Sequence, residues 1–300
     1  MKFKEFRKKN VGLLLILPWW IGFAIFKLYP FISSLIYSFH DYNLFRTATF
    51  SGLSNYKKIL GDPLIMKAFI QTFKYAFLTV PLELIFALFI AYILNFKIKG
   101  VNFFRTAYYI PSILGGSVSI AVLWRFLFKT EGLVNMIASR FGIQPFNWLG
   151  DPGGAFWVIV FLKIWQFGSP MVIFLAALKG VSKDLYEAAE IDGAGRFARF
   201  RKLTLPFMLF ATMPVLLSQF IGNFNNFGIF YFLRGGLYMD GYFLASDTDL
   251  LINWLYNLSI DNNYYSIGAA ISLIIFLITS AISLVVYIKS PSYREEDTFQ

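Results

Sequence analysis

The chain consists of long apolar segments, each long enough to form a helix, separated by shorter polar segments. Long apolar stretches with few or no charges are separated by segments that hold most of the Lys, Arg, Asp and Glu residues. About 20 apolar residues are enough for a helix to cross the hydrocarbon core of a bilayer. The pattern therefore predicts six membrane-spanning helices, at residues 11–28 with an apolar continuation through residue 39, 75–95, 106–128, 155–178, 205–233 and 262–288.

The composition also favours a membrane protein. Hydrophobic residues make up 57% of the 300 residues and charged residues only 15%, whereas soluble domains carry about 25% charged residues. Helices satisfy their backbone hydrogen bonds within one segment, as lipid requires, and the sequence lacks the short alternating segments of a membrane barrel. We therefore predict an all-α, polytopic membrane protein. With no Cys and a single His, the sequence excludes a thiolate site and disfavours a His-rich metal centre.

The distribution of basic residues predicts how the spans are oriented. If the N-terminus lies in the cytoplasm, the cytoplasmic segments hold 16 Lys and Arg residues and the outer segments 8, in agreement with the positive-inside rule. The net charge of +10 therefore reflects orientation rather than nucleic-acid binding. No small-residue cleavage site follows the first apolar run, so we expect a retained span. The predicted organisation is a cytoplasmic tail (1–10), a six-helix membrane domain (11–288) and a second cytoplasmic tail (289–300).

The cytoplasmic loop at residues 179–206 carries the most specific pattern in the sequence. Ser182 can cap a short helix over residues 183–191, and acidic residues lie early in that helix, where the helix dipole favours them. Gly193 and Gly195 follow, and glycines permit a sharp turn. The pattern predicts a helix that ends in a tight reversal of the chain.

A second short helix, basic and amphipathic, is predicted at residues 196–203. Its apolar residues recur at every third position: Phe197, Phe200 and Leu203. Pro206 then begins the fifth span, at a position where a missing N–H costs little. A helix–turn–helix of this kind suits docking to a partner protein. The sequence contains no GxxxxGK[ST] phosphate loop, so ATP would have to be bound by another polypeptide.

Three groups of residues in this loop resemble a family signature: Glu187-Ala188-Ala189, Asp192-Gly193-Ala194 and Leu203-x-Leu205-Pro206. Their order and spacing resemble the EAA loop of the membrane subunits of binding-protein-dependent ABC importers. Shorter segments at 28–30, 52–56, 103–106 and 124–125 resemble sugar permeases of the MalF/UgpA family. Ser182 departs from the family pattern, which often has Pro there, and Leu203 stands where Ile is common. The resemblance implies the six-helix, MetI-like permease core of a type I sugar ABC importer.

The resemblance also implies roles for residues and partners. The second short helix would be a coupling helix inserted into a groove of a cytoplasmic ATPase dimer, which would bind ATP and Mg while this chain holds no cofactor. Glu187 would fix the loop by charge pairing, and Gly193 would set the angle between its helices. The coupling residues implied are Glu187, Ala188, Ala189, Asp192, Gly193, Ala194, Phe197, Phe200 and Arg201.

Further partners implied by the resemblance are a second, related permease subunit, an extracellular or periplasmic sugar-binding protein and an oligosaccharide. The location implied is a bacterial or archaeal cell membrane, with both termini in the cytoplasm. The chain would be a transporter subunit rather than an enzyme.

The predicted fifth span contains several amide side chains, which are costly in lipid and should face the protein interior or a cavity. Gln219, Asn223 and Asn226 fall on one face of a continuous helix. These amides could hydrogen-bond to the hydroxyls of a sugar, or they could hold the helices together. The stretch also resembles the Asn-Asn-Phe region of the larger maltose-transporter membrane subunit. That resemblance implies substrate contacts at Asn223, Asn225, Asn226 and Tyr231. Gln219 is a further candidate contact because of its place on the amide face.

Two charged residues lie within predicted spans, Glu83 in the second and Lys163 in the fourth. They could pair with each other or line the substrate path, or Lys163 could extend to the outer interface. A Lys163 side chain that faced the path would favour an acidic, uronate-containing oligosaccharide over a neutral one. The alternative function is a secondary transporter driven by an ion gradient, for which Glu83 is the candidate carboxylate.

Overall fold

The computed structural model describes residues 11–96, 99–228 and 249–289. Within them the chain is mostly helical, with one short pair of strands. It divides into two compact units. Of the described residues, the first comprises 11–62 and 255–276, and the second comprises 63–96, 99–228, 249–254 and 277–289.

The first unit begins with a helical run interrupted by one wide turn. Helix α2 (Val11–Phe23) leads into a π-helical turn, η1 (Ala24–Leu28), and then into α3 (Tyr29–Ser38). The backbone N–H of Tyr29 donates to the carbonyl oxygen of Ala24, five residues back. Pro30 has no N–H to donate and its ring crowds the preceding turn, so a widened turn lets the helix continue. The predicted apolar continuation through residue 39 is thus part of the same span.

Polar contacts stabilise the loop after this span. Strands β1 (His40–Asp41) and β2 (Thr49–Phe50) pair antiparallel, and α4 (Ser54–Gly61) follows. The buried Asn55 Nδ2 donates to the carbonyl oxygens of Ser38 at 2.9 Å and His40 at 2.8 Å. An amide in the loop helix therefore holds the end of α3. Helix α4 is therefore a short helix between the first two predicted spans.

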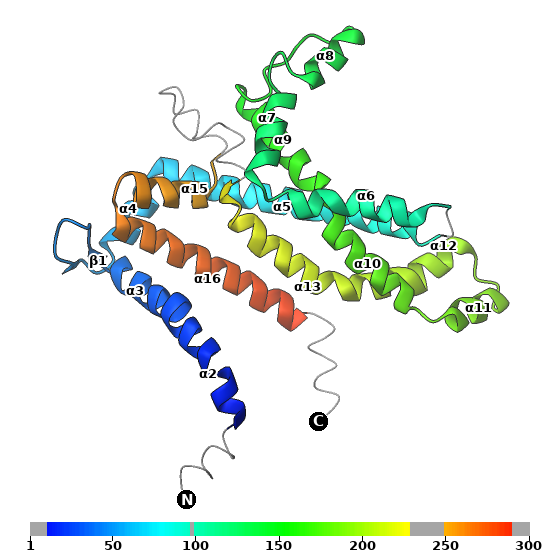
Figure 1. The fold of residues 1–300 in the computed structure, drawn as a ribbon, viewed down its shortest axis with the longest axis horizontal. Coiled ribbons are helices and arrows are strands. Elements are labelled where there is room, and N and C mark those ends of the chain that lie inside the picture. The colour runs from blue at the N-terminus through cyan, green and yellow to red at the C-terminus, as the bar shows by residue number, and fades with distance from the viewer. Residues whose placement is uncertain (1–10, 97–98, 229–248, 290–300) are drawn as a thin grey trace, which may run out of the picture. The chain divides into compact units, whose positions relative to one another are not determined.

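Helix α5 (Pro63–Leu94) is the longest element of the second unit, at 32 residues. It begins 12 residues before the predicted start at residue 75, because Pro63 suits the first position of a helix and the two lysines that follow do not break it. Helices α9 (Pro152–Trp165), α10 (Gly168–Gly180) and α13 (Leu205–Phe224) all pack on α5 (Figure 1). Helices α9 and α10 together form the predicted fourth span.

The predicted third span is not one straight helix. It consists of α6 (Val101–Leu114) and α7 (Val118–Leu127), which are bent by 103° with respect to each other. The break falls at residues 115–117, where Gln166 Nε2 donates to the carbonyl oxygen of Gly115 at 3.0 Å. Ser117 then caps α7 by accepting from the backbone N–H of Ile120. A continuous apolar pattern concealed this break because both halves are apolar.

The remaining helices of the described chain are α8 (Leu133–Arg140), α15 (Leu251–Tyr256) with the π-helical turn η4 (Asn257–Asp261), and α16 (Tyr265–Lys289). Helix α8 is a short helix between the third and fourth predicted spans. Among the described residues, four helices are long and apolar enough to cross a membrane. The count rises to six when each of two bent pairs is taken as one span: α6 with α7, and Arg196–Met208 with Thr212–Phe224. The predicted all-α, six-helix membrane fold is confirmed on that count.

Candidate functional site

The first helix of the predicted docking loop has the predicted bounds. Helix α11 runs from Lys183 to Ile191, and Ser182 caps it by accepting from the backbone N–H of Asp184 at 3.1 Å. Asp184 also lies in the first turn, where its charge meets the positive end of the helix dipole. Local chemistry is therefore enough to determine where this helix begins.

The turn after α11 requires glycine at one position. Gly193 has a φ of +74°, in the left-handed region. Its N–H donates to the carbonyl oxygen of Glu190 at 3.0 Å, and the N–H of Ala194 donates to that of Ala189 at 2.9 Å. This pair of bonds is a Schellman motif, which closes the helix and turns the chain. Gly195 also lies in the turn, but its φ is −61°, so the turn requires a glycine at position 193 and not at position 195.

The second short helix does not end at residue 203 as predicted. Helix α12 (Arg196–Arg199) passes into a π-helical turn, η2 (Phe200–Thr204), and then directly into α13 (Leu205–Phe224). The N–H of Leu205 donates to the carbonyl oxygen of Phe200, five residues back. The wide turn again precedes a proline, here Pro206, by the arrangement seen before Pro30. The loop is consequently joined to α13 without a non-helical residue between them, and the run from Arg196 to Phe224 bends by 55° between Met208 and Thr212.

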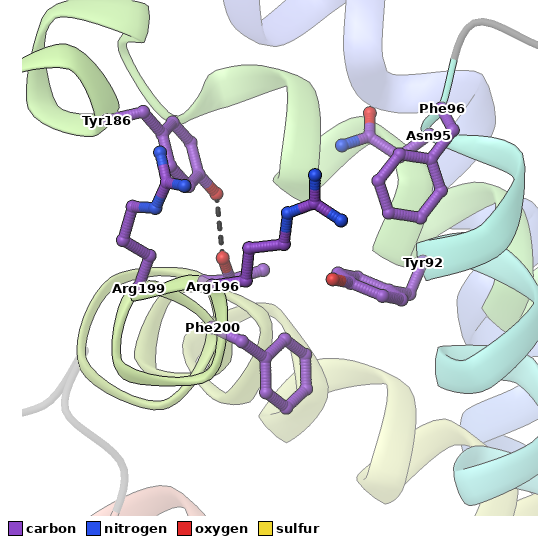
Figure 2. Close-up of a pocket in the computed structure, with 8 residues that line it drawn as sticks. Tyr92, Asn95, Phe96, Tyr186, Arg196, Arg199 and Phe200 are labelled. Atoms are coloured by element: carbon purple, nitrogen blue, oxygen red, sulfur yellow. Dashed lines mark hydrogen bonds between the residues drawn. The ribbon is translucent and has the colours of Figure 1, made fainter. Parts of the chain in front are cut away.

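The apolar residues of the loop face in different directions. Ile191 and Phe197 are 86% and 75% exposed. Phe200 instead packs edge-on against Tyr92 of α5, with ring centroids 5.0 Å apart (Figure 2). The predicted common face of Phe197, Phe200 and Leu203 is therefore divided, since Phe200 and Leu203 are half-buried.

Two polar contacts hold the loop helices together. The hydroxyls of Tyr186 and Thr204 are hydrogen-bonded at 2.8 Å, between α11 and η2 (Figure 2). Arg199 Nη1 lies 2.8 Å from Glu190 Oε2. The other predicted coupling residues lie at the surface, where Glu187, Ala188, Asp192 and Arg201 are exposed and Ala189 and Ala194 half-buried. Glu187 has no ion-pair partner among the described residues.

A polar cluster lies inside the second unit, among three helices predicted to cross the membrane. Lys163 Nζ of α9 donates to Gln219 Oε1 of α13 at 2.9 Å and lies 3.4 Å from Glu83 Oε2 of α5. The Glu83 side chain is 0% exposed and that of Lys163 15%. The two charges pair, as buried charges in apolar surroundings must. The interpretation that Lys163 extends to the outer interface is wrong.

The predicted sugar-binding amides do not form one helical face. Helix α13 ends at Phe224, so Asn225 and Asn226 lie beyond it. The Asn225 side chain is exposed and donates to the carbonyl oxygen of Ile221 at 2.9 Å, within its own helix end. Asn226 Nδ2 donates to the hydroxyl of Tyr75 at 3.0 Å. Tyr231 lies outside the described residues.

Asn223 differs from the other amides. It is fully buried, and neither atom of its amide has a hydrogen-bond partner among the described residues. In sequence it falls between Gln219 of α13, which contacts Lys163, and Asn226 just beyond the helix, which contacts Tyr75. A cavity of about 350 Å³ between α10 and α13 reaches Gln219. Part of the amide set thus holds helices together, while Asn223 is left able to bond to something else.

Sequence reasoning missed Tyr75, whose hydroxyl receives the hydrogen bond from Asn226. A signal was present, because Tyr75, Thr79 and Glu83 recur at every fourth position and all three are fully buried on α5. Among the described residues, no group of three His, Asp or Glu side chains is placed to bind a metal ion.

Comparison with known proteins identifies the class. Residues 63–294 match the family model described as "Binding-protein-dependent transport system inner membrane component". The chain belongs to this family: it is a multi-pass membrane permease subunit of an ABC importer, and the ATPase site is carried by a separate polypeptide. The secondary-transporter alternative is wrong on this finding.

Several relatives match over more than nine-tenths of their length. The "Probable ABC transporter permease protein YesP" of Bacillus subtilis is 39% identical, over 97% of this chain and 94% of the relative. The "Trehalose/maltose transport system permease protein MalF" of Thermococcus litoralis is 34% identical, over 97% of both chains. A chain from the crystal structure of a bacterial alginate ABC transporter, in complex with its alginate pentasaccharide-bound periplasmic protein, superposes with a TM-score of 0.80 at 20% identity, over 96% and 98% of the two chains. That likeness confirms the permease fold.

Proposed function

We propose that this chain imports an oligosaccharide that an extracellular binding protein delivers. The proposal is carried by one observation: an exposed helix–glycine–helix loop leads directly into α13, which bends by 55° between Met208 and Thr212 and then holds Gln219 and Asn223. Relatives named as trehalose/maltose and arabinooligosaccharide permeases support a sugar as the substrate.

The loop is proposed to couple the permease to a cytoplasmic ATPase dimer, which binds ATP and Mg. Ile191 and Phe197 are large apolar side chains that the chain itself leaves uncovered, so they suit a groove on that partner. Asp192 and Arg201 lie exposed beside them and can pair with charges at the groove's rim. When the ATPase dimer closes, the loop moves, and the helical connection through η2 passes this movement to α13.

Asn223 is the proposed sugar contact in the membrane. A buried amide without a partner costs about 1–3 kcal/mol, and a sugar hydroxyl can both donate to it and accept from it. Asn226 and Gln219 are proposed to hold the helices beside this position, because their hydrogen bonds go to Tyr75 and Lys163. A neutral oligosaccharide is the proposed cargo, because the positive charge of Lys163 is balanced by Glu83.

The assembly proposed around this chain is a heterodimer with a second, related permease subunit. Both termini are proposed to lie in the cytoplasm of a bacterial or archaeal cell, where the basic segments are concentrated. Numerous apolar side chains on the first span are exposed, among them Leu15, Phe26 and Tyr29. Lipid or the second subunit would cover them.

The test is reconstitution of the chain in liposomes with its ATPase, second permease and binding protein. We expect ATP hydrolysis and uptake that both rise when a cognate oligosaccharide is added with the binding protein. Uptake that follows a proton or sodium gradient, with no dependence on ATP, would overturn the proposal. Oligosaccharides with and without uronate residues are compared in the same assay, and stimulation only by uronate-containing sugars would overturn the neutral cargo.

A further inference from the structure

A second pocket lies at the C-terminal end of α5, apart from the membrane polar cluster. Its volume is about 500 Å³. Its walls come from the end of α5, from α11 and from the helical run that begins with α12; the lining residues are Tyr92, Asn95, Phe96, Tyr186, Arg196, Arg199, Phe200 and Thr204. It therefore lies where a membrane span meets the coupling loop (Figure 2).

The pocket combines aromatic walls with two guanidinium groups. Among the described residues that line it, none is acidic. Arg199 is already paired with Glu190 at 2.8 Å, whereas Arg196 has no ion-pair partner within the described part of the chain. Figure 2 shows the Arg196 side chain extending between Tyr186 on one side and Tyr92 and Asn95 on the other. One cation of the pocket is thus available to a ligand.

The guanidinium of Arg196 is not needed to neutralise the C-terminal end of α5. The last carbonyls of a helix carry partial negative charge, but Arg105 Nη2 donates to the carbonyl oxygen of Leu94 at 2.9 Å. The partial negative charge at the end of α5 is therefore already compensated by Arg105 of α6. The positive potential of Arg196 is left for an anion from outside the chain.

We propose that this pocket binds a phosphate group, and that the group belongs to the headgroup of an anionic phospholipid. A guanidinium fork matches the oxygens of a phosphate, and basic pockets between membrane helices on the cytoplasmic side take anionic headgroups. The rings of Tyr92, Phe96 and Phe200 supply the apolar wall that the glycerol and upper acyl chain of a lipid would contact. A bound lipid would bridge the end of α5 and the coupling loop.

The location of this pocket at the cytoplasmic membrane surface rests on the proposed function, but its ligand can be measured without transport. The transporter complex that contains the full chain is reconstituted in nanodiscs of phosphatidylcholine with or without phosphatidylglycerol. It is then purified in detergent, and the lipid that remains bound is quantified by mass spectrometry. We expect retention of phosphatidylglycerol over phosphatidylcholine. Arg196→Ala should weaken that retention about tenfold, the effect of losing one charge-assisted hydrogen bond, and Arg196→Lys should restore part of it.

The matched control is Arg140→Ala, an exposed arginine at the end of α8, which should leave lipid retention unchanged. Thermal unfolding of each complex verifies that the variants are folded. Equal retention of phosphatidylglycerol by Arg196→Ala and the unchanged chain would overturn the proposal. Displacement of the lipid by inorganic phosphate at similar concentration would overturn the lipid as the source. Loss of the ATPase subunit in Arg196→Ala, with lipid retention intact, would assign the arginine to protein docking instead.

Discussion

The coupling loop and the membrane polar cluster are built by different means. In the loop, Ser182 begins a helix and Gly193 ends it, both through contacts within a few residues. In the cluster, Glu83, Lys163 and Gln219 come from three helices far apart in sequence and meet only after the chain has folded. The conformation of the loop is therefore determined by local contacts, and many of its side chains are exposed. The cluster is determined by contacts between helices distant in sequence, and its side chains are buried.

Because of this difference, substitutions in the cluster and in the loop should affect different properties of the protein. A change in the cluster leaves a buried polar group without its partner, so it should lower the free energy of unfolding. A change on the exposed face of the loop removes nothing that the fold uses, so it should act on the partner instead. The following substitutions test that division.

Glu83→Ala should have the largest effect on stability. It leaves the Lys163 ammonium buried without its counter-charge, which costs about 3–5 kcal/mol. Thermal unfolding of the purified transporter measures the loss. The double variant Glu83→Gln with Lys163→Met removes both charges and should recover most of it. An unchanged melting temperature for Glu83→Ala alone would show that the pair does not stabilise the spans.

Gly193→Val should uncouple ATP hydrolysis from transport. A β-branched residue with φ near +74° costs about 1–2 kcal/mol in backbone strain, although no atom lies within 4 Å of a Cβ there. We expect the turn to change its angle, so that ATP is hydrolysed with little uptake in proteoliposomes. Gly195→Ala is the control, since Gly195 has a negative φ and open space around it. Intact transport by Gly193→Val would contradict the coupling role of the turn.

Asn226→Ala and Asn223→Ala should separate helix association from substrate contact. Loss of the hydrogen bond to Tyr75 should lower the free energy of unfolding by about 1 kcal/mol. Asn223→Ala breaks no hydrogen bond within the described chain, so stability should stay the same or rise slightly, while sugar uptake falls. Thermal unfolding and uptake are measured for both variants. A stability loss in Asn223→Ala as large as that in Asn226→Ala would make Asn223 a structural residue as well.

Phe197→Ser should have the smallest effect on stability, within about 0.5 kcal/mol, because its side chain is 75% exposed. Its effect should appear as weaker binding of the ATPase subunit in co-purification. Phe200→Ser is the contrasting variant, because Phe200 packs on Tyr92 and its loss should destabilise the loop itself. Equal losses of stability and of ATPase binding in the two variants would contradict the assignment of Phe197 to the partner surface and Phe200 to the packing on α5.

Much of the fold could be predicted from hydrophobic length, because lipid selects long apolar helices. The bounds of α11 and its cap followed from side-chain chemistry near Ser182, and the turn at Gly193 followed from its place after the helix. The break between α6 and α7 could not be predicted from the sequence, because both halves are apolar. It is stabilised in part by a hydrogen bond to the Gly115 carbonyl oxygen from Gln166, 51 residues further along the chain. The separation of Phe197 from Phe200 also depended on a distant residue, Tyr92.

By itself, the sequence determined a membrane-spanning helical protein, its orientation bias and a loop of the importer type, because these depend on composition and on contacts between near neighbours. Only the tertiary structure decided how its few polar residues are used. Gln219, Asn223, Asn225 and Asn226 look alike in the sequence, yet one contacts a lysine, one is buried without a partner, one closes its own helix and one bonds to Tyr75. The reason is physical: an amide's role depends on what lies within hydrogen-bonding distance, and helices packed from distant parts of the chain set those distances.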